Sequence, residues 1–419
     1  MMTQAYYTGI SGLQNSSYGI DIVSDNLANV NTAGFRSSGY EFASLFEEPV
    51  ATTSNITNNS VGLGTRLQAT STNQSQGSLL ASERSTDLAI MGDGWFGVEG
   101  EGSDPLYTRN GAFTFDEQRD LVTADGKYVL GTMAGNINGE TLTAQLPETP
   151  LSDVAAQEKL RFPDTLTFPP QATTKVEFSG NIGTVNETRT MSSTVIDANG
   201  DKNALKLEFT MIDPQTPPGT QWSVTATTQD IQDPTLIYDT QRGVVSFDER
   251  GALINSSLTT IDNNGSAVNI DLGSGFDGVV SIGNMDITAS SSADGIAKGD
   301  LVGYDINQNG EVIATFTNGM QSSVGKVAVY HFQNDQGLDR VSGTYFASSA
   351  NSGQAIFYQD GNGQNITGTQ MTNFKLEGSN VDMTVGLTDL IILQRTYDAN
   401  SKTITTADEM IQKALNMDA

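Results

Sequence analysis

A helical pattern lies at each end of this chain, and a long middle region with a different period separates the two. From Ile10 onward, apolar residues recur every three, four or seven positions, as they do on one face of an α-helix. The pattern stops near Gly34, which suits the left-handed residue that follows many helices. We therefore expect an amphipathic helix within residues 1–35.

The C-terminal pattern is more regular than the N-terminal one. Its apolar residues step alternately by three and four from Leu390 to Ala414, nearly four heptads in which Asn400 is polar. Before it, Ser379 and Asp382 have the spacing of a capping box, with the Ser379 hydroxyl as the expected cap. This pattern predicts a second amphipathic helix within residues 379–419.

Two amphipathic helices at opposite ends of a chain need a partner for their apolar stripes. The simplest arrangement pairs them with each other as a stalk. A stalk this narrow cannot cover both stripes alone, so we also expect them to pack between subunits of a homopolymer. The residues expected at this polymer interface are Ile10, Leu13, Ile20, Val23, Leu27, Val30, Leu390, Leu393, Tyr397, Ile404, Ala407 and Ile411.

Between the helical ends the apolar period changes to two, which is typical of strands. Only 17% of the residues are charged and 43 are glycine, a composition that favours short strands and tight turns. Asn-Gly and Asp-Gly pairs recur and predict two-residue hairpins, with both residues at positive φ. These pairs begin at Asn110, Asp125, Asn138, Asn199, Asn264, Asp277, Asn309 and Asn318. The expected fold class is multidomain and mainly β, with discontinuous β domains and an α-helical coiled-coil stalk formed by the N- and C-terminal helices.

Changes of pattern along the chain predict the domain boundaries. A Pro-rich stretch over residues 147–170 and a Ser-rich stretch over 290–295 indicate connections on either side of an insert. The expected parts are a terminal helical domain (1–35 and 379–419), a connecting segment (36–75 and 366–378), a β domain (76–145 and 291–365) and an inserted outer β domain (146–290). Residues 47–60, rich in Thr, Ser and Asn, are expected to form an exposed, flexible loop.

Charge and composition exclude several classes of partner. The formal net charge is -28, from 49 acidic and 21 basic residues, so nucleic acid and anionic membranes are poor partners. Without cysteine, the chain cannot form a disulfide scaffold or a thiolate metal site. No stretch approaches the length of about 20 apolar residues needed to span a membrane, and the N-terminus has no export-signal pattern.

Motifs that would indicate an enzyme are weak throughout. Residues 92–97 match a Gly-rich dinucleotide fingerprint, but no helix pattern follows to hold a pyrophosphate, so we interpret them as a β-turn. The segment beginning at Asp305 imitates a calcium loop, but Phe316 stands where a bidentate Glu is required. The only histidine, His331, lies in an alternating strand pattern. We therefore expect no catalytic, cofactor-binding or metal-binding residues and no enzymatic activity.

Three segments together resemble the flagellar rod and hook protein family. The first is Gly9-Ile-Ser-Gly-Leu13 followed by Asn26-Leu-Ala-Asn-Val-Asn-Thr-Ala-Gly-Phe-Arg36. The second runs from Gly94-Trp-Phe-Gly-Val98 through Tyr107-Thr-Arg-Asn-Gly-Ala-Phe113 to Leu121-Val-Thr-Ala-Asp-Gly-Lys-Tyr-Val-Leu-Gly131. The third is Leu376-Glu-Gly-Ser-Asn-Val-Asp382 with Gln394-Arg-Thr-Tyr397 beyond. They cover about half of the chain and occur in the family's order.

This resemblance implies terminal helices at the inner wall of a tube, with β domains stacked outward. The insert at 146–290 favours a hook subunit, which would form a curved tube that passes torque as a universal joint. A distal rod protein lacks most of such an insert and is the alternative, and a secreted β-rich adhesin is a second one from another class. The implied partners are many copies of the chain, the distal rod protein, the hook–filament junction protein and the hook cap protein. The implied location is the extracellular flagellum, reached through the flagellar type III export system.

Overall fold

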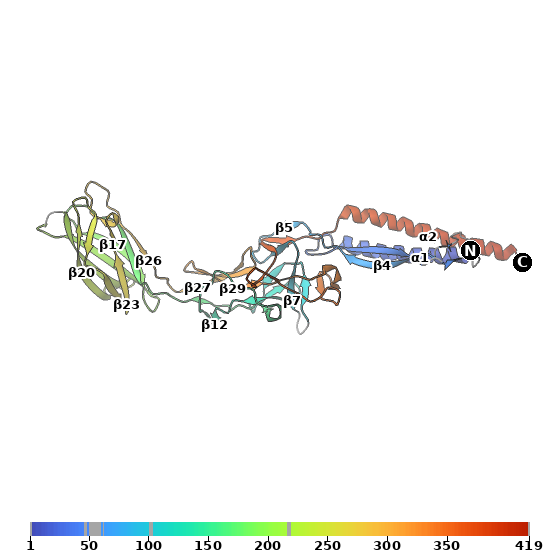
Figure 1. Cartoon of the computed structure of the whole chain (residues 1–419), viewed down its shortest axis with the longest axis horizontal. Helices are drawn as coiled ribbons and strands as arrows, with labels where there is room; N and C mark the ends of the chain where they lie inside the picture. The colour runs from blue at the N-terminus through green and yellow to red at the C-terminus, as the bar shows by residue number, and fades with distance from the viewer. Residues whose placement is uncertain are drawn as a thin grey trace.

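A computed structural model describes residues 2–45, 48–49, 60–61, 63–99, 104–215 and 219–417. Figure 1 shows a long molecule with three successive parts. A stalk that contains both termini lies at one end, a β domain lies in the middle, and a β-sandwich lies at the other end. The expected fold class is confirmed, because the chain is mainly β and its two terminal helices pack together. Most of the loop expected at 47–60 lies outside the described residues.

The stalk consists of two long helices and a β-hairpin. Its elements are α1 (Met2–Ala28), α2 (Met383–Met417), β1 (Ser38–Ser44) and β4 (Thr65–Thr72). Strands β1 and β4 pair antiparallel, with a bulge between Glu41 and Phe42, and they pack on α1. Two further short strands, β2 (Glu48–Pro49) and β3 (Ser60–Val61), pair with each other. Residues 36–75, expected as a connecting segment, therefore supply a hairpin to the stalk.

Helix α2 begins with a side-chain cap that differs from the predicted one. The Asp382 carboxylate accepts hydrogen bonds from the backbone N–H groups of Thr384 (2.8 Å) and Val385 (3.1 Å), which makes Asp382 the N-cap. The Ser379 hydroxyl instead accepts from Val381 N–H at 3.3 Å, before the helix starts. The prediction of a Ser379 cap was wrong, because the helix begins three residues later than a capping box at Ser379 requires.

The middle domain is formed by residues 79–168 and 299–377. Most of its strands join one large sheet of order β12-β13-β15-β27-β28-β29-β11-β7-β8-β32-β31, to which β9, β10, β14 and β30 add. The strands of this sheet are β7 (Trp95–Glu99), β8 (Leu106–Thr108), β9 (Phe113–Phe115), β10 (Leu121–Thr123), β11 (Tyr128–Met133), β12 (Ile137–Asn138), β13 (Thr141–Leu142), β14 (Glu158–Lys159), β15 (Thr167–Phe168), β27 (Gly299–Ile306), β28 (Glu311–Phe316), β29 (Gln321–Val327), β30 (Val329–Tyr330), β31 (Asp339–Ser342) and β32 (Tyr345–Ala347).

Short strand pairs complete the middle domain. Strand β6 (Leu88–Met91) pairs with β35 (Gln370–Asn373), β5 (Leu79–Ala81) with β36 (Lys375–Glu377), and β33 (Tyr358–Gln359) with β34 (Asn365–Ile366). Two 3₁₀ turns, η1 (Val154–Ala156) and η2 (Asp335–Gly337), lie between strands. Strands β35 and β36 lead directly to α2, so the segment before the last helix is anchored in the middle domain.

The outer sandwich is formed by residues 175–293. A five-stranded antiparallel meander contains β17 (Arg189–Ile196), β18 (Lys202–Met211), β19 (Thr220–Asp230), β20 (Ile237–Phe247) and β21 (Leu253–Ser256). The second sheet contains β16 (Lys175–Asn181), β22 (Thr260–Asn263), β23 (Ser266–Asp271), β24 (Gly273–Ser274), β25 (Asp277–Val280) and β26 (Ser290–Ala293). Alternate residues of β19, beginning with Trp222, are buried, so the predicted period of two is confirmed here. These side chains fill a core separate from that of the middle domain.

Five turns share one hydrogen-bond pattern that explains part of the acidic composition. A side-chain oxygen at the first position accepts from the backbone N–H groups of the third and fifth positions. The first residues are Asp116, Asp197, Asp248, Asn307 and Asp360. The fourth residues all have positive φ and are Arg119, Gly200, Gly251, Gly310 and Gly363.

Two of the eight two-residue hairpins expected at the Asn-Gly and Asp-Gly pairs are replaced by such longer turns. At Asn264-Gly265 both residues have positive φ (48° and 86°), as the prediction requires. The pairs at Asn199 and Asn309 instead occupy the third and fourth positions of the five-residue turns. Asp277-Gly278 lies within strand β25. The dipeptide alone does not determine loop length, because the capping Asp or Asn lies two residues earlier.

Candidate assembly surface and stalk junction

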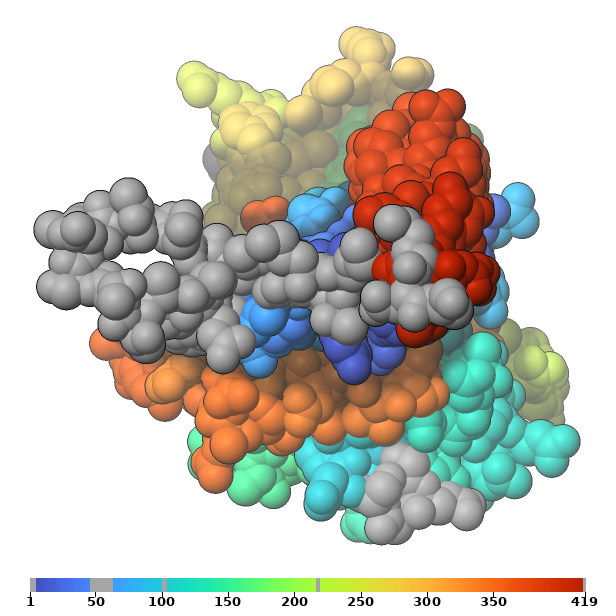
Figure 2. Space-filling model, turned by 90° about the vertical axis from the view of Figure 1, so that its right-hand side faces the viewer, coloured from blue at the N-terminus to red at the C-terminus, as the bar shows by residue number. Residues whose placement is uncertain are grey.

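The two stalk helices approach closely because α1 carries glycines on the side that faces α2. A Cβ atom added at Gly9 would lie 2.8 Å from the Ile404 side chain, and one added at Gly19 would lie 2.8 Å from Leu393. Glycine weakens a helix by about 1 kcal/mol relative to alanine, so α1 depends on packing against α2. Viewed from the free end of the stalk, α2 lies against α1 (Figure 2).

The residues predicted at the polymer interface form much of this seam within one chain. Val23, Leu393 and Ala407 are buried, and Tyr397 is exposed. The half-buried members are Ile10, Leu13, Ile20, Leu27, Val30, Leu390, Ile404 and Ile411. Because Ile404 and Leu393 contact α1 of the same chain, a second subunit is not needed to explain why they are apolar. Their part in contacts between subunits remains a prediction.

A second set of large apolar side chains on the helices is exposed. We call it the outer helix surface, and its members are Tyr6, Tyr7, Tyr18, Met383, Val385, Leu387, Ile391, Ile392, Tyr397, Met410 and Leu415. Ile391 and Ile392 are 52% and 55% exposed. Apart from Tyr397, sequence reasoning missed this surface because it followed one stripe per helix. The run from Leu390 to Leu393 was the available signal, since four consecutive apolar residues cannot share one stripe.

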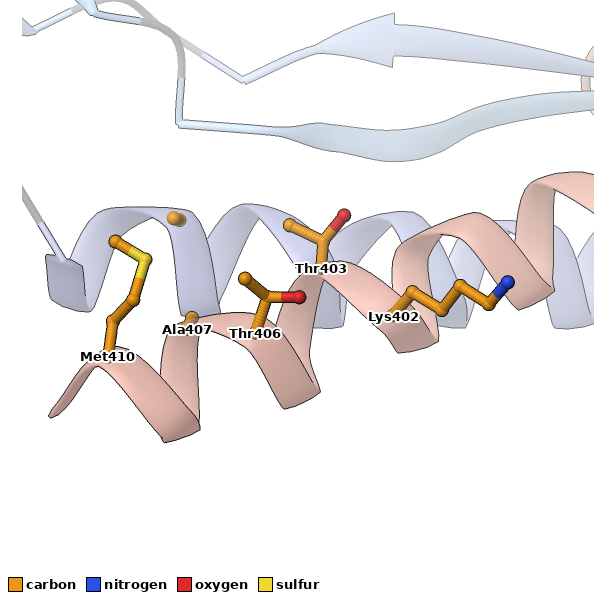
Figure 3. A pocket seen from close by; sticks show the side chains of 6 residues that line it. Lys402, Thr403, Thr406, Ala407 and Met410 are labelled. Carbon is orange, nitrogen blue, oxygen red and sulfur yellow. The ribbon is translucent and has the colours of Figure 1, made fainter. Parts of the chain in front are cut away.

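A cavity of about 330 Å³ opens between the helices near the free end of the stalk (Figure 3). Its lining consists of Ala5, Lys402, Thr403, Thr406, Ala407 and Met410. Small and apolar side chains predominate, and Lys402 is the one charged residue of this lining. Such a lining suits an apolar side chain better than a charged cofactor.

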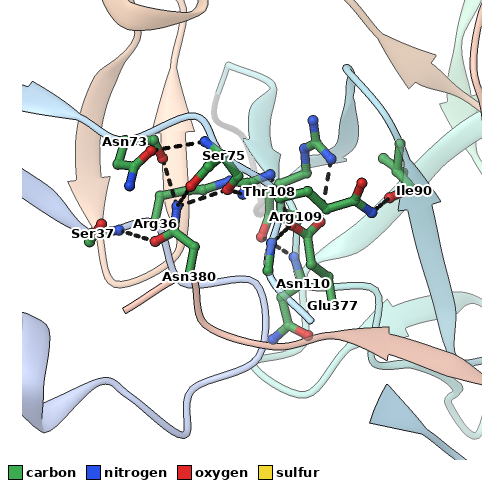
Figure 4. A network of polar contacts seen from close by, with 12 residues as sticks. Arg36, Ser37, Asn73, Ser75, Ile90, Thr108, Arg109, Asn110, Glu377 and Asn380 are labelled. Atoms are coloured by element: carbon green, nitrogen blue, oxygen red, sulfur yellow. Dashed lines mark hydrogen bonds and ion pairs between the residues drawn. The ribbon is translucent and has the colours of Figure 1, made fainter. Parts of the chain in front are cut away.

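The stalk meets the middle domain at a buried cluster of charged side chains, which we call the stalk junction (Figure 4). The Glu377 carboxylate pairs with Arg36 at 2.9 Å through one oxygen and with Arg109 at 3.3 Å through the other. All three side chains are at most 3% exposed. Glu377 also accepts from Gly77 N–H at 3.0 Å, and Arg36 donates to the Ser75 carbonyl. One carboxylate therefore ties together three other segments of the chain.

Asn380 adds a second polar tie beside this cluster. Its side-chain oxygen accepts from Ser37 N–H at 2.7 Å, and its amide nitrogen donates to the carbonyls of Asn73 and Ser75, both at 2.9 Å. Asn380 lies three residues before Met383, the first residue of α2. The segments that lead into α2, out of α1 and out of β4 are thus joined at one point.

Aromatic rings and arginines stack along the same junction. The Arg340 guanidinium lies 4.9 Å from the centre of the Phe35 ring and 5.3 Å from that of Phe346. The Phe346 ring lies 4.8 Å from Trp95, and Arg109 lies 5.4 Å from Trp95 on the way to Glu377. Cation–π contacts are stronger where water is excluded. The stack therefore extends the junction from the loop after α1 into the core of the middle domain.

Burial lowers the pKa of both arginines of the stalk junction. Removal from water, and secondly repulsion by Arg109, lowers the pKa of Arg36 to about 10. Burial also lowers the pKa of Arg109, although the nearby Glu377 opposes that shift. Both side chains keep their positive charge at neutral pH, so the junction holds two buried cations that depend on Glu377.

Three sequence families match separate segments of the chain. Residues 7–36 match the flagella basal body rod protein family, and residues 89–186 match the flagellar hook protein FlgE/F/G D1 domain. Residues 374–417 match the flagellar basal body rod FlgEFG protein C-terminal family.

Curated relatives match nearly the whole chain. It is 28% identical to the flagellar hook protein FlgE of Borreliella burgdorferi and 27% identical to that of Escherichia coli, in each case over 99% of this chain and 100% of the relative. Together these matches support a flagellar hook or rod family protein. A crystal structure of Helicobacter pylori flagellar hook protein FlgE2 shares its fold, with a TM-score of 0.50 and 18% identity over 71% of this chain and 100% of that one.

The stalk junction brings together one residue from each of the three segments that match flagellar hook and rod families. Arg36 lies in the first segment, Arg109 in the second and Glu377 in the third. These segments are far apart in the sequence and meet through a single carboxylate. The three parts of the chain that resemble the family most clearly are therefore also joined physically.

The residues considered for catalysis or nucleotide binding make contacts that serve the fold. His331 is buried, its Nε2 lies 2.7 Å from the Thr367 carbonyl, and its ring stacks on Tyr358 at 4.2 Å. Of residues 92–97, which we interpreted as a β-turn, residues 92–94 bend the chain and residues 95–97 belong to strand β7. Within the described ranges, no group of three or more His, Asp or Glu side chains is placed to hold a metal ion. The same residues include no helix with the length and apolarity needed to cross a membrane.

Proposed function

We propose that this chain is the structural subunit of a bacterial flagellar hook and that it self-assembles into a curved hollow tube. In this role the tube acts as a universal joint that transmits torque from rod to filament. Full-length similarity to several hook proteins supports the proposal. The relatives are structural flagellar proteins, and we propose no enzymatic activity for this chain.

The observation that carries the proposal is the outer helix surface. Exposed apolar side chains extend along α2 from Met383 to Leu415, although the two helices already cover each other's inner stripes. An apolar surface of this kind on a stalk is expected to be buried against another molecule. Because both termini lie on one stalk, many copies arranged side by side would bring their helices together around a common axis.

The inserted outer sandwich distinguishes a hook subunit from the alternatives. We propose that the stalk, the middle domain and the outer sandwich, near the boundaries expected from the sequence, form the inner, middle and outer layers of the tube. A distal rod protein would not need the sandwich, and an adhesin would not need paired terminal helices. The proposed partners are further copies of the chain, the distal rod protein, the hook–filament junction protein and the hook cap protein, outside the cell after type III export.

Negative-stain microscopy of the purified protein tests this function. Tubes should appear as protein concentration rises, and also as salt rises from very low values, because subunits of charge -28 repel less once screened. Ile391→Asp should abolish tubes, because it places a carboxylate on the outer helix surface. Ile254→Asp, at a site 64% exposed on the outer sandwich, is the matched control and should still form tubes. Wild-type protein that stays monomeric under all these conditions would contradict the proposal.

A further inference from the structure

The stalk junction is built differently from an ordinary domain contact. It buries two arginines and one glutamate, so its charges do not cancel locally. Within the described chain, Nε of Arg109 and both Nε and Nη2 of Arg36 have no hydrogen-bond partner, so the contact of Arg36 with Glu377 is an ion pair without hydrogen-bond geometry. Glu377 is the one group that forms an ion pair with both cations. A buried ion cluster of this kind is weak evidence for stability, since apolar side chains often stabilise as well or better.

We propose that Arg36, Arg109, Glu377 and Asn380 act as a stalk lock that fixes the direction of the stalk relative to the middle domain. This inference rests on the proposed function, because a polymer subunit must hold its layers at one angle to fit its neighbours. The four residues are positioning residues: they set the geometry of the surfaces that meet other subunits without contacting those subunits themselves.

Glu377 and Asn380 each contact more than one segment, which favours a fixed orientation of the stalk over a nonspecific contact. The two oxygens of Glu377 bind arginines on different segments, one after α1 and the other after β8. Asn380 contacts the segments after α1 and β4 at the same time. Hydrogen bonds depend on angle, and an ion pair weakens as its charges move apart, whereas apolar contacts tolerate sliding. Rotation of the stalk would break several of these contacts together.

Backbone contacts of Gly34 hold the stalk in the same orientation as the side chains of the lock. Gly34 has φ of 69° and donates its N–H to the Glu377 carbonyl at 2.7 Å. A Cβ atom at Gly34 would lie 2.3 Å from the backbone nitrogen of Asn110. The backbone at the exit of α1 is thus pressed against the segment that carries Arg109, so side-chain and backbone contacts hold the same orientation.

Pulsed electron paramagnetic resonance on the monomer tests the lock. The chain has no cysteine, so spin labels can be placed at Gln394→Cys on α2 and Glu117→Cys in the middle domain, which are both exposed. The unaltered junction should give one narrow distance distribution. Glu377→Gln should make it about twofold wider, because both buried cations lose their counter-charge. An unchanged width in Glu377→Gln would overturn the proposal.

A matched control separates the lock from general loosening of the fold. Glu311→Gln removes a buried carboxylate that pairs with Lys326 inside the middle domain, outside the stalk junction and outside the labelled turn. It should leave the distribution narrow, and widening equal to that of Glu377→Gln would also overturn the proposal. If Glu377→Gln fails to fold, Asn380→Ala takes its place with the same expected widening and the same contrary result.

Different results would disprove the stalk lock and the proposed function. Wild-type tubes together with an unchanged Glu377→Gln distribution would disprove the lock and leave the hook subunit standing. A wild-type protein that never forms tubes would disprove the hook subunit, whatever the spin labels show.

Discussion

The three parts of the molecule are joined at two crossings, and the two crossings are built from different interactions. At the stalk junction, four segments meet around buried charges and stacked rings. At the outer crossing, formed by residues 169–173 and 294–298, two segments meet at a β-bridge between Gln171 and Ile296, with backbone hydrogen bonds of 2.8 and 2.9 Å. In the described structure, no ion pair involves either of these outer segments.

Side chains contact the outer crossing from both of the parts that it joins. Thr173 is buried, accepts from Ile196 N–H at 2.8 Å and donates its own N–H to the Ile196 carbonyl at 2.9 Å. Asp294 accepts from Thr174 and Lys175. These contacts tie the crossing to the sandwich. On the other side, the Asn318 side chain donates to the Ala297 carbonyl at 2.8 Å, and Ile296 packs against the core of the middle domain. Because the outer crossing is held by hydrogen bonds and a β-bridge, without the buried ion pairs of the stalk junction, we expect it to be the more pliable of the two.

The largest expected effect is at the stalk junction. Glu377→Leu leaves two buried arginines without their carboxylate counter-charge, so the free energy of unfolding of the middle domain should fall by about 3–5 kcal/mol. Thr173→Val, the comparison at the outer crossing, loses one hydrogen bond and should cost about 1 kcal/mol. Urea titrations measure the free energy of unfolding of both variants. Equal decreases in the two variants would contradict the proposed difference between the crossings.

A core mutation in the sandwich tests whether a loss of stability there passes through the outer crossing to the middle domain. Trp222 is fully buried, and Trp222→Ala should destabilise the sandwich by about 3–5 kcal/mol through loss of packing. The unfolding transition of the middle domain should stay where it is, because the two cores are separate. Calorimetry that shows both transitions falling together would mean that the outer crossing is rigid.

The middle domain should weaken in mild acid through its one histidine. Burial lowers the pKa of His331 below its usual value of 6.5, so the unfolded chain takes up a proton first. The contribution of His331 is therefore present above about pH 6.5 and is lost as pH falls through the lowered value, with a slope of at most about 1.4 kcal/mol per pH unit. His331→Gln should flatten this part of a melting-temperature profile of the middle domain. An identical melting-temperature profile in the variant would contradict the assignment of this pH dependence to His331.

The smallest effect concerns the turn at Asp116. Arg119 has φ of 59° at the position that glycine occupies in the four related turns. Arg119→Gly and Arg119→Ala both remove the exposed pair with Asp164, but only the first removes the Cβ atom. Glycine should therefore be more stable than alanine here by about 1 kcal/mol. Greater stability of the alanine variant in thermal unfolding would show that the turn is relaxed with a side chain present.

Local patterns in the sequence predict most of the fold and little of the junction. The helices and the alternating strands could be predicted because their periods are read from neighbouring residues. The pairing of Arg36 with Glu377 joins residues more than 300 positions apart, and no local pattern signals it. The outer helix surface was missed for another reason, since the side of α2 that α1 covers depends on the glycines of α1.

The mechanical contrast between the crossings is tested most directly by cryo-electron microscopy of the assembled, curved tube. Subunits on the inner and outer sides of the curve can be superimposed on their middle domains. The stalks should then coincide, while the outer sandwiches should differ by rotation about residues 169–173 and 294–298. Sandwiches that coincide while the stalks diverge at Arg36 and Glu377 would contradict the account.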